Sequence, residues 1–576
     1  MSNSDHEPIK KEGPSKNHEL SNNSSTDEED DAAVKQMISG GTSVIVAGMV
    51  AGLIGWILCI FASRPDIGIG ASGYALYSTV NSFIVVIGAI SGGFNQSISK
   101  YIAEGLVESE KKGLDYSRGG AISSTLIGFI AFSAFIVLSI ISLFTNLITY
   151  SIVYLFIAIA VLFSFIRDNL VGNLAGIHKF NKIGLINFLG AVGGILVGLI
   201  SILIVPPPYT AIVFASQVIG FTLAQVIFSI IFVNKYSKFN FRSIYKLPSS
   251  WKISKKISSY GFYCTIPQVI LSGSIFWIQT VYYQFYFTPS SEIVGISGII
   301  IGYSGVMSAI SFYGWPQIPA VSEAKAKNNQ KLIDKLVSQV FRTGFNVSIM
   351  FLVFYIGLAH PMLELFHTVE YLPGYIPFIL LSVSTTLIGL TFIIASMLIG
   401  LGEAKIAFIH ISIIIIGSFI LTPLLISALT MLPDPFLPLY AGPLGLFIPT
   451  VVVLPLLFRF LPRYTNRPAK YYLIILLKGT ISVSTAFTVS LLVENFLYPY
   501  NTFWYGVPTG FLVGILVNVG IFIFLMCFLS ALSEKDWELF EGSLGPLKIL
   551  TVLPKWISLH SPFYSPEVEE PIQNKE

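Results

Sequence analysis

The stretch YSIVYLFIAIAVLFSFIRDNLVGNLAGI, from Tyr150 to Ile177, indicates the fold class of this protein. It exceeds the roughly 20 mostly apolar residues that a transmembrane helix needs to cross the hydrocarbon core. Its only charged residues are Arg167 and Asp168, which stand side by side near its end. Runs of this kind recur along the chain, so the sequence predicts a bundle of membrane-spanning helices.

The composition supports the same class. Of the 576 residues, 53% are hydrophobic and only 11% are Asp, Glu, Lys or Arg, whereas soluble proteins carry about 25% charged residues. The mean hydropathy is +0.74. Soluble, disordered, coiled-coil and secreted disulfide-rich classes are excluded on this basis. We therefore expect an all-α, polytopic membrane protein.

Fourteen apolar runs are separated by polar, Gly or Pro residues. We expect spans at approximately 37–62, 73–97, 119–146, 150–177, 183–205, 209–233, 257–285, 293–317, 336–359, 371–400, 405–430, 436–460, 471–496 and 503–531.

The basic residues predict how these spans are oriented. With the N-terminus in the cytoplasm, 31 of the 34 Lys and Arg residues fall in or beside cytoplasmic segments. Arg64 falls in an outer loop, and Arg167 and Lys478 fall within spans. This asymmetry is what the positive-inside rule requires. We expect a multi-pass protein of the cell membrane with both termini in the cytoplasm.

The spans group into segments of different composition. We expect a disordered acidic cytoplasmic tail (1–35), a six-helix lobe (36–233), a basic cytoplasmic linker (234–256), a second six-helix lobe (257–460), helices thirteen and fourteen (461–531) and a cytoplasmic C-terminal tail (532–576).

A weak internal repeat relates the two lobes. The second span ends in Gly93-Phe94-Asn95-Gln96 and the eighth in Gly314-Trp315-Pro316-Gln317, and each motif is followed by a glutamate, Glu104 or Glu323. Because these spans are six apart, the lobes would share one orientation and be related by an axis along the membrane normal. The alternative is chance similarity between two hydrophobic hairpins.

The sequence lacks the motifs of membrane-bound catalysis. It contains no phosphate-binding glycine loop followed by Lys-Ser/Thr, no His-Glu-x-x-His and no nucleophile elbow. Its three cysteines are too few and too widely spaced for a disulfide framework or a zinc site. We expect neither an enzyme nor a cofactor, a metal site or a nucleic-acid partner.

Polar residues inside spans are therefore the candidate functional residues. Arg167, Asp168 and Asn169 come first, because the planar guanidinium of arginine can donate two hydrogen bonds to a phosphate. The alternative is that Arg167 extends to the cytoplasmic headgroups and Asp168 balances its charge.

Five further residues complete the candidate set. Asn95, Gln96, Gln317 and Lys478 are candidates for substrate binding, and His410 for proton sensing. Lys478 is also explained by extension of its side chain to the interface, and His410 by a structural role.

Four motifs resemble those of polysaccharide and oligosaccharide-lipid flippases in the multidrug/oligosaccharidyl-lipid/polysaccharide exporter superfamily. They are Gly70-Ala71-Ser72-Gly73-Tyr74-Ala75-Leu76-Tyr77, the block from Gly93 to Ala103, the stretch from Gly172 to Phe180, and Leu532-Ser533-Glu534-Lys535-Asp536. The resemblance covers about residues 36–541. Ala71 and Ala75 depart from the first motif, and the first two spans lack the arginines of the lipid II flippase branch.

The resemblance implies two six-helix lobes around a central cavity, with two additional C-terminal helices. It implies that a polyprenyl- or dolichyl-linked glycan is moved between leaflets by alternating access, in contact with membrane lipids and with a coupling ion as a candidate partner. Two alternatives stay open: a cation-coupled exporter of drugs or metabolites, whose branch has twelve spans, and a membrane glycan polymerase or ligase, which the short outer loops disfavour.

Overall fold

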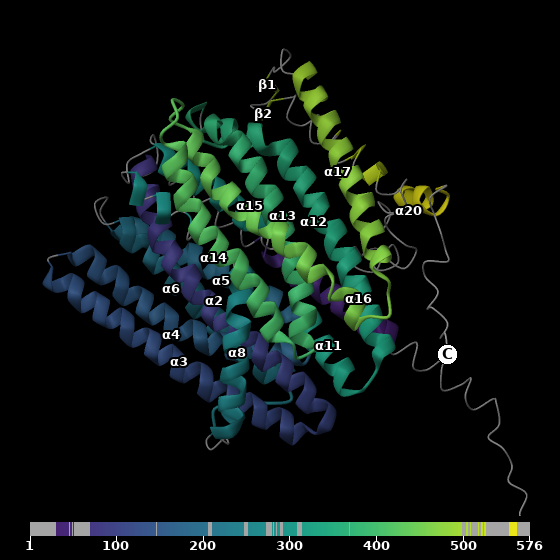
Figure 1. Ribbon diagram of the computed structural model, residues 1–576. Helices are drawn as coiled ribbons and strands as arrows, with labels where there is room; N and C mark the ends of the chain where they lie inside the picture. The colour runs from purple at the N-terminus through teal and green to yellow at the C-terminus, as the bar shows by residue number, and fades with distance from the viewer. Residues whose placement is uncertain are drawn as a thin grey trace, which may run out of the picture.

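The computed structural model describes residues 30–44, 46–48, 50, 70–145, 147–205, 210–246, 251–271, 279, 281–283, 285–287, 292–307, 314–367 and 369–497, with short segments at 503–504, 507–508, 517, 520–521, 523–525 and 552–561. Among these residues the chain is almost entirely helical (Figure 1).

The helices are α2 (Gly70–Glu108), α3 (Glu110–Phe144), α4 (Ile148–Gly176), α5 (Phe180–Ile204), α6 (Thr210–Tyr236), α7 (Phe241–Ile244), α8 (Trp251–Leu271), α10 (Glu292–Met307), α11 (Gln317–Ala326), α12 (Gln330–Phe366), η3 (Val369–Gly374), α13 (Tyr375–Gly400), α14 (Ala404–Leu429), η4 (Leu437–Tyr440), α15 (Ala441–Phe458), α16 (Leu461–Tyr464), α17 (Ala469–Leu497) and α20 (Val552–Leu559). Two short strands, β1 (Phe503–Trp504) and β2 (Val507–Pro508), pair antiparallel.

Nine helical segments in the described part of the chain are long and apolar enough to cross a membrane. They coincide with nine of the fourteen predicted spans, and large apolar side chains such as Phe144 and Leu203 are exposed on them. A water-soluble protein rarely exposes so much contiguous apolar surface, so this is a multi-pass membrane protein. The first and fourteenth predicted spans lie largely outside the described residues, and the count of fourteen stays a prediction.

Local signals explain where several helices begin. The side chain of Ser109 accepts a hydrogen bond from the backbone N–H of Lys112 at 3.2 Å, and the Asn329 side chain accepts from Leu332 N–H at 2.9 Å. Both residues act as N-caps, of α3 and α12 respectively. Helix α2 continues through Lys100 to Glu108, because a helix can extend beyond the apolar run that crosses the lipid.

Among the described residues a helix runs over 30–44, so it includes Asp30 in the predicted tail and the start of the first predicted span. The carboxylate of Asp30 accepts a hydrogen bond from Asn329 at 3.0 Å, and Asp31 forms an ion pair with Lys335. On the same helix, Gly40 lies against Phe180. The helix therefore contacts both α5 and the start of α12.

Helices α2 to α6, the first half, pack on one another, and α13 packs with α12, α14 and α15 in the second half. The halves meet mainly where α2 lies against α8 and α11. In Figure 1 the turn between α3 and α4 lies at the left and that between α14 and α15 at the top, while the opposite ends of these hairpins lie toward the bottom.

We call the end that carries Ser109, His178, Asn328 and Gly402 the basic end. The charge distribution predicts it to be cytoplasmic.

Two turns at the basic end have the same backbone structure. His178 N–H donates to Ala175 O at 2.9 Å, and Gly402 N–H donates to Ile399 O at 3.0 Å. His178 and Gly402 have φ of 57° and 88°, both in the left-handed region. These turns follow the fourth and tenth predicted spans, six apart, and a turn of the same kind follows α11 at Asn328, with φ 55°.

The glycines that end α4 and α13 also make matching close approaches. A Cβ on Gly176 would meet Ile102 and the carbonyl of Ser99, and a Cβ on Gly400 would meet Val321 and the carbonyl of Ile318. This register makes Glu104 correspond to Glu323. In this register Gln317 lies two residues beyond the position that corresponds to Gln96, whereas the sequence motif pairs the two glutamines.

Helix α17 lies on the outside of α12 (Figure 1). Tyr472 is fully buried, with its ring edge-on to Phe341 at 5.2 Å between centroids. A Cβ on Gly479 would come within 2.5 Å of Phe345. Because α17 buries an aromatic anchor and approaches α12 closely, it is an integral part of the bundle.

Candidate functional site

Arg167 and Asp168 form a buried ion pair on α4. Nε and Nη2 of Arg167 both lie 2.7 Å from Asp168 Oδ1. Asp168 is 4% exposed, and its Oδ2 has no hydrogen-bond partner among the described residues. In a low-dielectric interior, removing one member of such a pair leaves an uncompensated charge. The pair thus neutralises a charge that the span would otherwise bury alone.

Gln225 on α6 extends this pair into a network. Its Oε1 accepts from Arg167 Nη1 at 2.6 Å, and its Nε2 donates to Asn187 Oδ1 on α5 at 3.0 Å. The side chain of Gln225 fits because Gly190 stands opposite, where a Cβ would lie 2.4 Å from it. Three helices of the first half are therefore joined around one guanidinium. Sequence patterns do not identify Asn187, because its contact is set by helix packing.

Asn169 and Asn95 are buried in the first half but not in this network. Asn169 Nδ2 donates to the hydroxyl of Tyr245, just after α7, at 3.3 Å. The side-chain oxygens of Asn169 and Asn95 have no hydrogen-bond partner within the described part of the chain. Buried unsatisfied acceptors are rare in folded proteins, and both oxygens are enclosed by the packed helices.

Gln96 and Gln317 lie in different settings. Gln96 Nε2 donates to Gln268 Oε1 on α8 at 2.5 Å, which joins the two halves. Gln317 Oε1 accepts from Ser396 on α13 at 2.8 Å, within the second half.

Lys478 and His410 lie apart from these residues. Lys478 is half-buried on α17, and His410 on α14 is paired through Nδ1 with Ile406 O at 2.9 Å. The structure places the predicted residues on five different helices, α2, α4, α11, α14 and α17, and joins only Arg167 and Asp168 directly.

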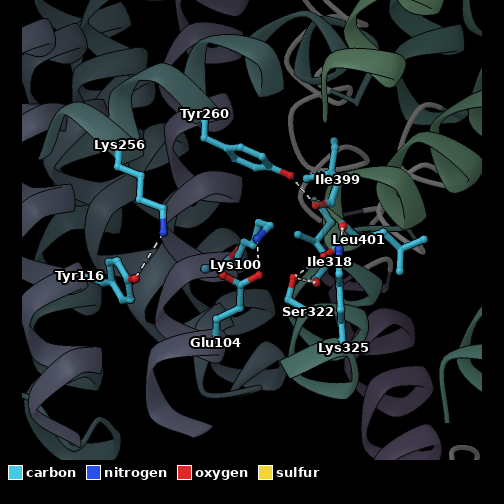
Figure 2. A network of polar contacts seen from close by, with 12 residues as sticks. Lys100, Glu104, Tyr116, Lys256, Tyr260, Ile318, Ser322, Lys325, Ile399 and Leu401 are labelled. Atoms are coloured by element: carbon cyan, nitrogen blue, oxygen red, sulfur yellow. Dashed lines mark hydrogen bonds and ion pairs between the residues drawn. The ribbon is translucent and has the colours of Figure 1, made fainter. Parts of the chain in front are cut away.

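A polar network lies at the basic end, where the halves meet (Figure 2). Lys100 is buried and forms an ion pair with Glu104 on α2. Lys256 extends toward the Tyr116 hydroxyl, 3.4 Å away, as Figure 2 shows. Its ammonium also lies 4.6 Å from the ring centroid of Tyr101, within the range of a cation–π contact.

The same network fixes the end of α13. Tyr260 donates to Ile399 O at 2.5 Å, Ser322 donates to Gly400 O at 2.9 Å, and Lys325 donates to Leu401 O. These donors satisfy the last carbonyls of a helix, which have no partner within the helix itself. The end of α13 is therefore held by side chains from α8 and α11.

A contact between His178 and Glu323 joins α11 directly to the turn after α4. His178 Nε2, in the turn between α4 and α5, lies 2.7 Å from Glu323 Oε2 on α11. Hydrogen bonding to His178 lowers the pKa of Glu323 from 4.5 to about 2, and Lys327 acts in the same direction. Sequence reasoning identifies both residues only as parts of motifs, because 145 positions separate them.

Comparison with solved structures identifies the fold. No protein-family profile and no curated protein matches the sequence. A crystal structure of a MATE protein in complex with MaL6 matches with a TM-score of 0.60 at 15% identity, over 76% of this chain and 98% of that one.

A second match shows the same correspondence. The outward-facing conformation of a multidrug resistance MATE family transporter of the MOP superfamily matches with a TM-score of 0.55 at 18% identity, over 75% of this chain and 94% of that one. At these identities the likeness establishes the fold, and the protein has the fold of MATE transporters.

Proposed function

We propose that this protein moves a lipid-linked oligosaccharide or polysaccharide precursor across the cell membrane by alternating access. The MATE-like fold supports transport, and the sequence motifs support a glycan-lipid substrate. The observation that carries the choice of substrate is α17. Drug exporters of the superfamily have twelve spans, whereas the flippase branch has fourteen, and α17 is the thirteenth span predicted from the sequence.

The extent of the structural matches agrees with this choice. MATE structures align over 94 to 98% of their own length but over only 75 to 76% of this chain. Helix α17 is packed against α12 through Tyr472 and Gly479. Helix α17, which corresponds to the thirteenth predicted span, therefore supports the flippase over an exporter of twelve spans.

The interior suits a hydroxyl-rich head group. Carrying such a group across about 30 Å of hydrocarbon requires a polar path, because each unsatisfied polar group costs several kcal/mol. Among the described residues, the buried polar side chains include uncharged amides from both halves. They are Asn95, Gln96, Asn169, Asn173, Gln225, Gln279 and Gln317. Amides donate and accept hydrogen bonds, as sugar hydroxyls do, whereas the lipid tail would stay in the bilayer.

Arg167 is the proposed phosphate ligand. Its Nε and Nη2 are occupied by Asp168 and its Nη1 by Gln225. A phosphate would therefore replace the carboxylate of Asp168 on the same donors.

Export of drugs is the second candidate, favoured by the multidrug transporters among the structural matches. The two are separated by ligand-induced thermal stabilisation of the purified protein. A polyprenyl diphosphate oligosaccharide should raise the melting temperature in a dose-dependent way, and a lipophilic cationic dye should not. Stabilisation by the dye alone would favour the exporter.

A further inference from the structure

The turn that carries His178 is strained. His178 has φ 57°, whereas the matching turn of the second half has a glycine, Gly402, at φ 88°. A side chain in the left-handed region costs about 1 kcal/mol or more. A histidine at this position is therefore explained by what its side chain contacts, and that contact is Glu323 of the other half.

The matching acid does not reach across. Glu104 corresponds to Glu323 in the register that the glycine contacts define, but it pairs with Lys100 on its own helix. The facing turn offers only Gly402, which has no side chain. Of the two corresponding glutamates, Glu323 therefore contacts the turn of the other half and Glu104 does not.

Other contacts between the halves lie close to this turn. The ring of Phe180 lies edge-on to Trp315 of the second half, with 6.1 Å between centroids. The carbonyl of His178 accepts from Gln36 at 3.5 Å, and the helix that carries Gln36 pairs with α12 through Asp31 and Lys335. Separating the halves here would break the polar and aromatic contacts together.

We infer that His178 and Glu323 form a latch that holds the basic end of the two halves closed, and that its release opens this end to substrate. The inference rests on the alternating access of the proposed function but not on the identity of the substrate. Substrate must enter between the halves, and this ion pair joins a turn of one to a helix of the other.

Lys327 supplies a matched control. It contacts the other oxygen of the same carboxylate, with Nζ 2.7 Å from Glu323 Oε1, but it follows α11 in the same half. Removing Lys327 takes one cationic partner from Glu323 without removing a bond between halves. Removing His178 takes away this one bond between the halves and leaves the others, such as Gln96–Gln268, in place.

The test is a distance measurement by pulsed electron paramagnetic resonance in detergent without substrate. Spin labels at Lys111 and Lys405, both exposed at the basic end of different halves, would be introduced after replacement of Cys59, Cys264 and Cys527. His178→Asn is the test variant, because asparagine adopts the left-handed region readily.

We expect His178→Asn to shift the ratio of closed to open molecules toward the longer distance by roughly fivefold, the upper range for a partly exposed ion pair. Glu323→Gln should shift it likewise, and Lys327→Gln should leave it as in the unchanged protein. A wild-type distance distribution in His178→Asn, or an equal shift in Lys327→Gln, would overturn the latch. Because no substrate is present, this result is independent of whether glycan lipids are transported.

Discussion

Arg167 and Asp168 are adjacent in sequence, yet Nε and Nη2 of the arginine both contact one oxygen of the aspartate at 2.7 Å. Adjacent residues of a helix do not normally face each other. The contact forms because the long arginine stem folds back while Gln225 holds the third nitrogen. Asp168 and Gln225 thus hold the guanidinium in one orientation.

Loss of this guanidinium should abolish transport. We expect Arg167→Ala to flip no glycan lipid and, because Asp168 is left unpaired, to melt at a lower temperature. Arg167→Lys should recover only part of the transport, because an ammonium keeps the charge but loses the planar fork. Flipping rate and thermal stability should be measured together. Full transport by the double variant Arg167→Ala/Asp168→Ala would show that the pair serves structure alone.

Close contact between α2 and α8 should make Gly93 intolerant of a side chain. A Cβ there would lie 2.6 Å from Thr265 Cα, so backbone must move, and overpacking of this kind costs about 1 to 3 kcal/mol. Gly88 on the same helix has open space and is the matched control. In thermal unfolding, Gly93→Ala should melt several degrees lower, while Gly88→Ala should not. Equal melting temperatures would contradict the packing of the halves.

Acid should weaken the contact at Glu323. Its pKa is lowered to about 2 by His178 in the folded protein, so its contribution to stability is fully present above the ordinary value near 4.5. That contribution is lost as the pH falls toward 2. The melting temperatures of wild type and Glu323→Gln should differ by a few degrees at pH 6, and the difference should shrink below the ordinary pKa near 4.5 and vanish only as the pH falls to about 2. A difference that is constant with pH would exclude the ionised carboxylate as its source.

The orientation of the bundle can be tested by labelling. A single cysteine at Lys246, in the basic segment before α8, should react with a membrane-impermeant reagent only after the cells are permeabilised. A cysteine at Asp434, in the turn before η4, should react from outside. Labelling at Lys246 in intact cells would reverse the predicted topology.

Helix positions were largely predictable because lipid imposes a simple requirement. The run from Tyr150 to Ile177 matches α4 (Ile148–Gly176) within two residues, since an apolar segment of that length has one stable arrangement in a membrane. The C-terminal end of α2 was not predictable from hydropathy, because the helix continues beyond the apolar run through Lys100 and Glu104, which form an ion pair.

The candidate site was less predictable, because hydropathy gives the depth of a residue but not the side of the helix that it occupies. Gln96 and Gln317 have similar motifs, yet one joins the halves and the other bonds within its own. His178 and Glu323 come together through the packing of two turns. In the sequence, the only indication was that a glutamate, Glu104 or Glu323, follows each repeat motif.

The central claim is tested most directly by glycan-lipid flipping in proteoliposomes. The purified protein is reconstituted with a labelled polyprenyl diphosphate oligosaccharide, and the fraction reached by an added glycosidase is followed in time. We expect protein-dependent transfer from the protected leaflet that is lost in Arg167→Ala. No transfer above protein-free liposomes, in preparations that do move a cationic dye, would contradict it.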